Sequence, residues 1–244
     1  MFELGSRKLD VTPPIGCYLA GYAARPGPST GVYHPLTASV VALSDGKSRV
    51  LTVSIEWLGF YERTPLVRQA LEEATGVPKE NVLLLGTHTH CGPAVRGLDA
   101  RRHGADTLDE AYLTRTVERF CLSAREAMAD RQLVQLWSGS GQCGFAASRL
   151  KPDGEGGVLW QPILDAPHDH EVPVLFAKNA DGKAVFAFFS YACHPQDLTV
   201  SRSCSTQASE AMSRLPGCSS RMAPTTTRRC TQRFGSTDTK WRNG

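Results

Sequence analysis

Two histidines separated by a single threonine form the clearest chemical feature of the sequence. The stretch NVLLLGTHTHCGPA, residues 81–94, runs from apolar residues into His88 and His90 and then into a turn at Gly92 and Pro93. Alternate side chains of an extended chain point to the same side, so we expect both imidazoles to project together, with Cα atoms roughly 7 Å apart. One ring is then available to bind a metal ion, and the other to hold a water molecule or a substrate oxygen.

A third histidine, His194, follows another apolar stretch, in the segment YACHPQD. Neutral imidazole is a good zinc ligand, and a catalytic zinc ion commonly has three protein ligands and one open position for water. His194 is therefore a plausible second ligand beside His88. The spacing leaves another interpretation open, because a histidine at the end of a strand often has a purely structural role.

Residues near these histidines offer other chemistry. Cys91 and Cys193 each adjoin one of them, which permits a cysteine hydrolase with a thiolate nucleophile and a histidine base. Adjacent side chains of an extended segment point to opposite faces, so small buried residues that fill space are the favoured interpretation of both cysteines. His168 and His170 flank Asp169 in a predicted loop, where these three side chains form an alternative metal site.

The elements that must position these side chains alternate between strands and helices. Two segments have apolar residues at three- and four-residue spacing, which predicts helices over residues 64–76 and 108–130. Two β-branched stretches separated by Asp-Gly predict a hairpin of residues 36–44 and 49–57. Other apolar runs predict strands over residues 81–86, 133–139, 172–179 and 183–192.

The order of these elements predicts an α/β (α+β) fold, a layered domain with a mixed β-sheet flanked by helices and incomplete at its C-terminus. The continuous apolar run at 81–86 is typical of a strand covered on both faces, so we expect the histidines at the end of a central strand. The first 35 residues, rich in glycine and proline, are expected to wrap over the core, and residues 141–170 to form a loop.

Composition limits the classes of function. The 244 residues are 41% hydrophobic and 21% charged, with a net charge of +3, which gives no electrostatic argument for nucleic acid or an anionic membrane. The chain as written has no signal peptide and no transmembrane segment, so a cytoplasmic protein of unspecified oligomeric state is expected. The eight dispersed cysteines lack a C-x-x-C pair and are interpreted as mostly reduced thiols.

Several stretches occur in the order found in one enzyme family: LDVTPPIGCYLAGYAAR, LLLGTHTHCGPA, DEAYLTRTVERF, GFAASRLKPDG, PHDHEVPVLFAKNADGKAV and FFSYACHPQDL. Over about residues 7–200 the chain resembles the amino-terminal catalytic domain of neutral and alkaline non-lysosomal ceramidases. G-T-H-T-H-x-G-P is the most specific of the shared motifs. The resemblance implies a partial ceramidase-like domain over residues 1–200 and a separate irregular tail over residues 201–244.

The resemblance also implies an activity and a set of site residues. Members of the family are zinc amidohydrolases that split N-acyl sphingosine through a zinc-activated water, so a small lipid amide substrate and one Zn²⁺ per chain are expected. His88 and His194 are similar to two zinc-binding histidines of the family. His90 resembles the motif histidine near the substrate amide, and Arg149 resembles an arginine of an N-R segment, although AASRL has no asparagine.

The tail departs from the family. Residues 201–244 are dense in serine, threonine, arginine and cysteine and show no strand or helix period. The family's G-D-x-S-P or G-D-x-N-P segment, and its later glutamate and tyrosine at the zinc site, are missing from the sequence. A truncated or frame-shifted product is the favoured interpretation and a natural short homologue the alternative, so a catalytically silent homologue or binding module without a complete zinc site is the alternative function.

Overall fold

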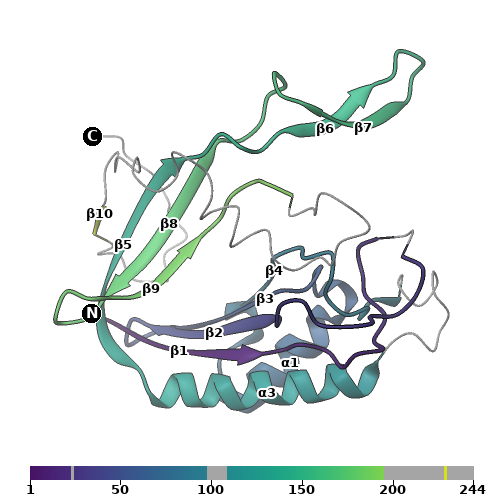
Figure 1. Cartoon of the computed structure of the whole chain (residues 1–244). Helices are drawn as coiled ribbons and strands as arrows, with labels where there is room; N and C mark the ends of the chain where they lie inside the picture. The colour runs from purple at the N-terminus through teal and green to yellow at the C-terminus, as the bar shows by residue number, and fades with distance from the viewer. Residues whose placement is uncertain (23–24, 98–108, 195–227, 230–244) are drawn as a thin grey trace. The chain divides into compact units, whose positions relative to one another are not determined.

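The computed structural model describes residues 1–22, 25–97, 109–194 and 228–229 (Figure 1). These residues fall into two compact units, one within residues 1–135 and the other within residues 136–229. The predicted boundary at residues 200 and 201, and the tail other than residues 228–229, lie outside the described residues, so the division into those two regions stays a prediction.

The first unit is built on a mixed sheet, as predicted. Its strands are β1 (Phe2–Asp10), β2 (Thr37–Ser44), β3 (Arg49–Ile55), β4 (Val82–Gly86) and the start of β5 (Gln132–Gln142). They hydrogen-bond in the order β4-β3-β2-β1-β5. The β3–β4 pair is parallel and the other pairs are antiparallel. A parallel pair needs a crossover connection, which here contains a helix.

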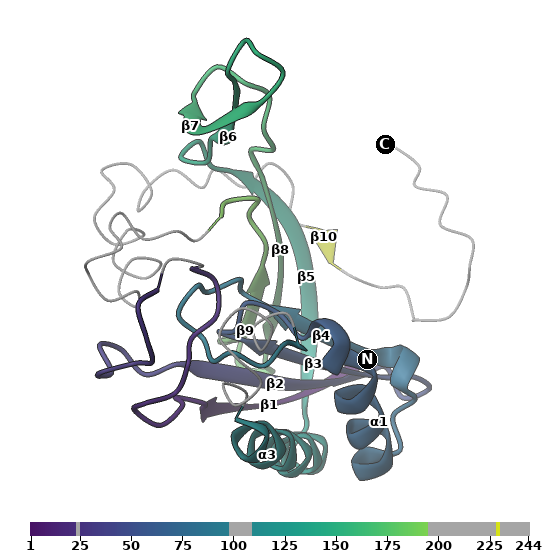
Figure 2. The same cartoon turned by 90° about the vertical axis from the view of Figure 1, so that its right-hand side faces the viewer.

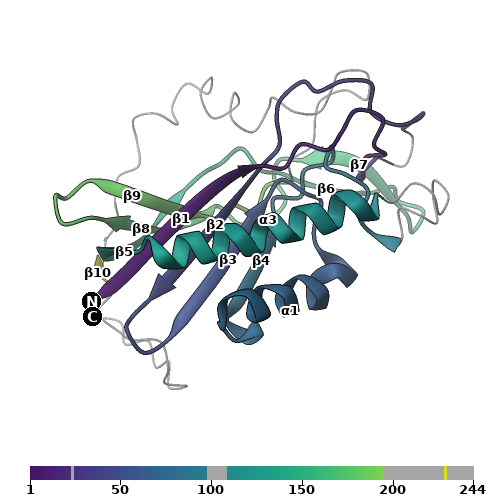
Figure 3. The ribbon, with the colours of Figure 1, turned by 90° about the horizontal axis from the view of Figure 1, so that it is seen from below.

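Two helices, α1 (Thr64–Thr75) and α3 (Glu110–Ala129), cover one face of this sheet (Figures 2 and 3). Short 3₁₀ turns, η1 (Tyr61–Arg63) and η2 (Lys79–Asn81), flank α1. A proline stands in the first turn of α1, and Gly76 ends this helix in the left-handed conformation with φ of 65°. Asp109 caps α3 by accepting a 2.7 Å hydrogen bond from the amide of Tyr112. Both helices therefore match the predicted segments to within two residues at each end.

The core lies between the sheet and the two helices. Alternate residues of β2 and β3 point into it, and Leu51, Val53 and Ile55 of β3 are fully buried. Trp57, just beyond β3, is also fully buried and packs against Phe120 of α3 with ring centroids 6.3 Å apart. The end of β3 is therefore held rigidly where the chain approaches the histidine segment.

Two expectations for the first unit are corrected. Residues 2–10 were included in the wrapping segment, yet they form β1, in which Gly5 lies so close to α3 that an added Cβ would be 1.9 Å from the carbonyl oxygen of Ala127. The second correction concerns β4, which was expected to be a central strand covered on both faces. β4 is the end strand of the described sheet, with Leu83 48% exposed.

The second unit contains the rest of β5 and the strands β6 (Ser148–Pro152), β7 (Val158–Ile163), β8 (Glu171–Lys178) and β9 (Ala184–Phe189). β8 and β9 form the predicted hairpin, and β5, β8 and β9 are hydrogen-bonded in that order. Residues 228–229 form β10, which pairs with β5. The predicted loop over residues 141–170 is wrong in part, because β6 and β7 form an antiparallel hairpin within it. β9 also ends at Phe189 rather than at the expected residue 192.

In the part of the chain that the structure describes, no helix is both long and apolar enough to cross a membrane.

Candidate metal centre

The histidine segment begins where β4 ends and is fixed to the neighbouring strand by backbone hydrogen bonds. The amide of Thr87 donates to the carbonyl oxygen of Ile55 at 2.9 Å, and the amide of His88 donates to that of Trp57 at 3.0 Å. His88 itself has φ of 64°, in the left-handed region that non-glycine residues rarely adopt. The sequence prediction of an extended segment is therefore wrong at His88, because its backbone is left-handed rather than extended.

The ring of His88 is oriented by the main chain. Its Nδ1 atom lies 3.1 Å from the carbonyl oxygen of Leu58. Because a carbonyl oxygen only accepts hydrogen bonds, this contact assigns the proton to Nδ1 and leaves the lone pair on Nε2. Histidines that bind metal ions almost always donate their other ring N–H to a carboxylate, a backbone carbonyl or water. His88 thus has the tautomer of a metal ligand.

His90 lies beside His88. Their ring centroids are 5.0 Å apart with an interplanar angle of 75°, and a possible ligand nitrogen on each ring lies within 4.8 Å of one on the other. Both ring nitrogens of His90 are buried from solvent. The structure therefore brings the two motif histidines together, as the sequence predicted, although through a left-handed residue rather than through an extended strand.

Sequence reasoning assigned no role to the residues that surround His90. The ring of Tyr22 meets the His90 ring edge-on at 5.1 Å, and the guanidinium of Arg25 donates to the His90 carbonyl oxygen at 2.9 Å. Gly21, with φ of 106°, lies so close that an added Cβ would be 2.6 Å from the Cβ of His90. The one available signal was the glycine of LAGY, because a glycine often marks a close approach of two backbones.

The other two predicted site residues belong to the second unit. His194 follows β9 in an irregular segment, and its neighbour Tyr191 donates a 2.8 Å hydrogen bond to the carbonyl oxygen of Cys143. Arg149 lies on β6, with its guanidinium carbon 5.3 Å from the ring centroid of Trp160. The positive charge of Arg149 also acts on the nearby Cys193 thiol. Arg149 and the segment that carries His194 are therefore neighbours within this unit.

The cysteine and acidic alternatives receive less support. Cys17, Cys121, Cys143 and Cys193 are free, as expected, whereas Cys91 is disulfide-bonded, so it is neither a thiolate nucleophile nor a simple buried residue. Burial raises the pKa of the Cys193 thiol, which makes the thiolate less available at neutral pH.

His168 and His170 are close, with ring centroids 4.1 Å apart. Asp169, however, uses its carboxylate to accept the amide of Glu171 at 2.8 Å. Among the described residues, this trio is not a group whose ligand atoms converge on one point.

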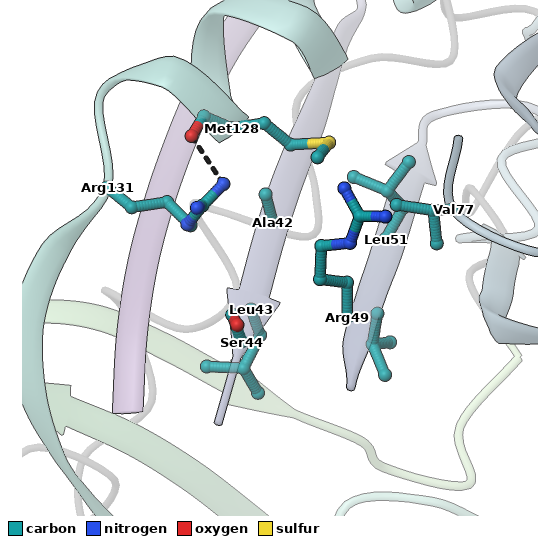
Figure 4. Close-up of a pocket in the computed structure, with 9 residues that line it drawn as sticks. Ala42, Leu43, Ser44, Arg49, Leu51, Val77, Met128 and Arg131 are labelled. Carbon is teal, nitrogen blue, oxygen red and sulfur yellow. Dashed lines mark hydrogen bonds between the residues drawn. The ribbon is translucent and has the colours of Figure 1, made fainter. Parts of the chain in front are cut away.

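A small pocket of the first unit lies at the hairpin end of β2 and β3 (Figure 4). Arg49 and Arg131 line it, and each donates to a backbone carbonyl oxygen, that of Gly76 and that of Met128 respectively. β3 begins at this pocket and ends beside the histidine segment, so the two sites are at opposite ends of the strand. The pocket has no histidine in its lining and offers no chemistry related to the candidate site.

The fold of this chain is similar to that of two solved structures. The chain aligns with the crystal structure of neutral ceramidase from Pseudomonas aeruginosa with a TM-score of 0.64 and 23% identity, over 81% of this chain and 32% of that one. A structure described as a ceramidase complexed with C2 gives a TM-score of 0.63 and 23% identity over 80% of this chain and 31% of that one. The described fold is thus one found in neutral ceramidase structures.

The sequence is similar to Neutral ceramidase A from Dictyostelium discoideum. The two are 27% identical over an alignment of 216 residues, and the match covers 81% of this chain and 29% of that protein. No protein-family model matches the chain. The resemblance to neutral ceramidases inferred from the motifs is confirmed, and the chain spans about 30% of the length of the proteins it matches.

Proposed function

We propose that this chain carries part of the active site of a zinc-dependent amidohydrolase of the neutral ceramidase type, acting on the amide of N-acyl sphingosine or a related N-acyl lipid. The observation that carries the proposal is the pairing of His88 with His90, in which the contact from Nδ1 to Leu58 leaves Nε2 of His88 as a lone-pair donor. The similarity to Neutral ceramidase A supplies the substrate class.

The proposal gives each residue a distinct role. His88 and His194 hold the zinc ion. The ion, when bound, supplies Lewis-acid chemistry, because it lowers the pKa of a coordinated water and polarises a carbonyl group. His90 and Arg149 face the substrate amide, where one donates to the developing oxyanion and a proton is delivered to the leaving amine.

A catalytically silent homologue or binding module is the second candidate. It is favoured by the described part of the first unit, which brings two imidazoles together where catalytic zinc sites commonly have three protein ligands. The two candidates differ in turnover and not in fold.

Metal content and turnover test the proposal. We expect about one zinc ion per chain in protein purified without chelator, and loss of that ion in His88→Ala and in His194→Ala, measured by elemental analysis. His34→Ala is the matched control, because His34 is an exposed histidine of the first unit outside the candidate site. His90→Ala and Arg149→Ala are expected to retain zinc but to lower the hydrolysis of a fluorogenic N-acyl sphingosine by about 100-fold or more.

The outcomes separate the candidates. Wild-type protein without zinc would remove the basis of the proposal. Stoichiometric zinc that depends on His88, together with no turnover of any N-acyl lipid, would favour the silent homologue.

A further inference from the structure

Arg25 lies against the main chain of the histidine segment. Its Nη2 atom donates to the carbonyl oxygen of His90 at 2.9 Å and lies 3.5 Å from the Sγ of Cys91. The Nε atom is buried and has no hydrogen-bond partner within the described ranges. The guanidinium carbon lies 5.4 Å from the ring centroid of Tyr22. A charged side chain is thus partly withdrawn from water at the residue that carries the second imidazole.

This withdrawal has a cost that needs an explanation. Burial lowers the pKa of Arg25 from its ordinary value, because removal from water disfavours the charged form. Long charged side chains generally keep the charged group in water. A buried charged group is found where it makes strong, directed hydrogen bonds. A charged donor to a backbone oxygen is such a bond, roughly twice as strong as its neutral counterpart.

Residues that precede Arg25 in the chain form backbone hydrogen bonds with the same turn. The amide of Ala20 donates to the carbonyl oxygen of Gly92 at 2.9 Å, and the amide of Ala94 donates to that of Tyr18 at 2.8 Å. The ring of Tyr22 contacts both the guanidinium of Arg25 and the ring of His90. Residues 18–22 and Arg25 therefore contact residues 90–94 at several points, and Arg25 contacts the backbone of the residue that carries the second imidazole.

We infer that Arg25 is a positioning residue of the histidine pair: its guanidinium fixes the His90 carbonyl and, through Tyr22, the orientation of the His90 ring relative to His88. It acts through His90 and contacts neither metal nor substrate. The inference rests on the proposed function only in its claim that the orientation of the pair serves metal binding and catalysis. The positioning itself is a property of the first unit.

Substitution of Arg25 by methionine and by lysine tests the inference. Methionine retains an apolar side chain of moderate length and loses the donor, whereas lysine retains the charge and one donor. The matched control is Arg49→Met, since Arg49 also donates to a backbone carbonyl oxygen, that of Gly76 at 3.1 Å, at the opposite end of β3. Two readouts are measured in full-length protein: amide hydrogen exchange of residues 87–94, and binding of Co²⁺ as a spectroscopic substitute for zinc.

We expect Arg25→Met to speed exchange over residues 87–94 by about tenfold or more. Because the loosened turn also carries the proposed ligand His88, we expect Co²⁺ binding to weaken by about 10- to 100-fold, the range typical of lost partners around a metal site. Arg25→Lys should recover part of both, and Arg49→Met should change neither. Unchanged exchange over residues 87–94 in Arg25→Met would overturn the inference. So would an equal loss of protection in α3, which would make Arg25 a general stabilising residue. Failure of the wild-type protein to bind Co²⁺ would count against the proposed function, while the exchange readout would still decide the inference.

Discussion

His88 combines a left-handed backbone conformation with a ring whose Nδ1 contacts a main-chain carbonyl oxygen. A non-glycine residue in this conformation costs about 1–2 kcal/mol. Two contacts offset that cost, the bond from its amide to the Trp57 carbonyl oxygen and the contact of its Nδ1 with the Leu58 carbonyl oxygen. Strained backbone of this kind is frequent at functional sites, where surrounding structure holds it in place. His88 is held in this conformation with its ring centroid 5.0 Å from that of His90.

Gly21 allows a test of how closely the site is packed. We expect Gly21→Ala to weaken Co²⁺ binding by about tenfold or more, because the new methyl group would lie 2.6 Å from the Cβ of His90 and displace the turn that also carries the proposed ligand His88. Gly16→Ala is the matched control, since Gly16 has φ of 92° but no atom within 4 Å of an added Cβ. The strained φ should cost about 1 kcal/mol of folding free energy in both variants, and Gly21→Ala carries in addition the cost of the contact with His90. Equal Co²⁺ affinities in the two variants would contradict the expectation.

The identity of the site residues was readable from the sequence, but their conformation was not. The pair of His88 and His90 was predicted because their types and spacing suit a metal. The left-handed turn at His88 was missed, since it depends on carbonyl oxygens of residues 57 and 58, about thirty positions away in the chain. Arg25 was missed for a similar reason. Its partner is the backbone oxygen of His90, and residue types do not indicate where a backbone atom accepts a hydrogen bond.

Among the elements, α3 connects the core to the segments around the site. Tyr112 of α3 donates its hydroxyl to the carbonyl oxygen of Val11 at 2.5 Å and accepts the indole N–H of Trp57 at 3.2 Å. Trp57 in turn receives the amide of His88. A buried hydrogen-bond chain of this kind orients its members more strictly than apolar packing alone.

Burial of this tyrosine gives the protein a defined response to high pH. It raises the pKa of Tyr112 to about 12, whereas the phenol of an unfolded chain ionises near 10. Above about pH 10 the unfolded state loses this proton first, so the contribution of Tyr112 to stability is complete below that pH and is lost as the pH approaches 12. Two pKa units correspond to about 2.7 kcal/mol.

Urea unfolding of wild type and Tyr112→Phe at about pH 8 and about pH 11 measures this contribution. We expect the wild type to lose more free energy of unfolding than Tyr112→Phe, by about 1 kcal/mol or more over this interval. Cys17, whose pKa burial raises to about 11, is present in both proteins, so its own titration contributes to both pH profiles. Parallel pH profiles would show that the Tyr112 phenol is not protected from ionisation.

The elements themselves were predicted best where the sequence has strong periodicity. The hairpin of β2 and β3 was found because Asp-Gly separates β-branched runs, and Asp45 accepts the amides of Lys47 and Ser48 at 2.8 and 2.7 Å. β1 was missed because FELGSRKLD mixes polar and apolar residues, and its glycine serves packing against α3 rather than a turn. The β6–β7 hairpin was missed because its strands are mostly exposed and so lack a periodic apolar face.

At the scale of the whole molecule, the two units differ in how much apolar surface they bury. The main core cluster lies entirely within the first unit. Among the residues of the second unit that the structure describes, few large side chains are buried and several are exposed, including Trp160 at 72%, Leu164 at 78% and Phe189 at 54%. Apolar burial is the dominant stabilising contribution to folding, so the second unit is expected to be the less stable one.

Hydrogen exchange of the intact chain, followed by mass spectrometry, compares the two units directly. We expect amides of β2 and β3 to be protected up to the free energy of global unfolding, and those of β6, β7 and β9 to exchange through local opening at least 100-fold faster. Equal protection of β3 and β9 would mean that the chain unfolds as one cooperative unit, contrary to the difference in burial.

The position of Trp57 gives the protein an intrinsic optical reporter. Its indole is fully shielded from water, and its own carbonyl oxygen receives the amide of His88. In a chain whose other three tryptophans are replaced by phenylalanine, the emission wavelength of this indole would follow the ordering of the histidine turn in real time, without any attached dye.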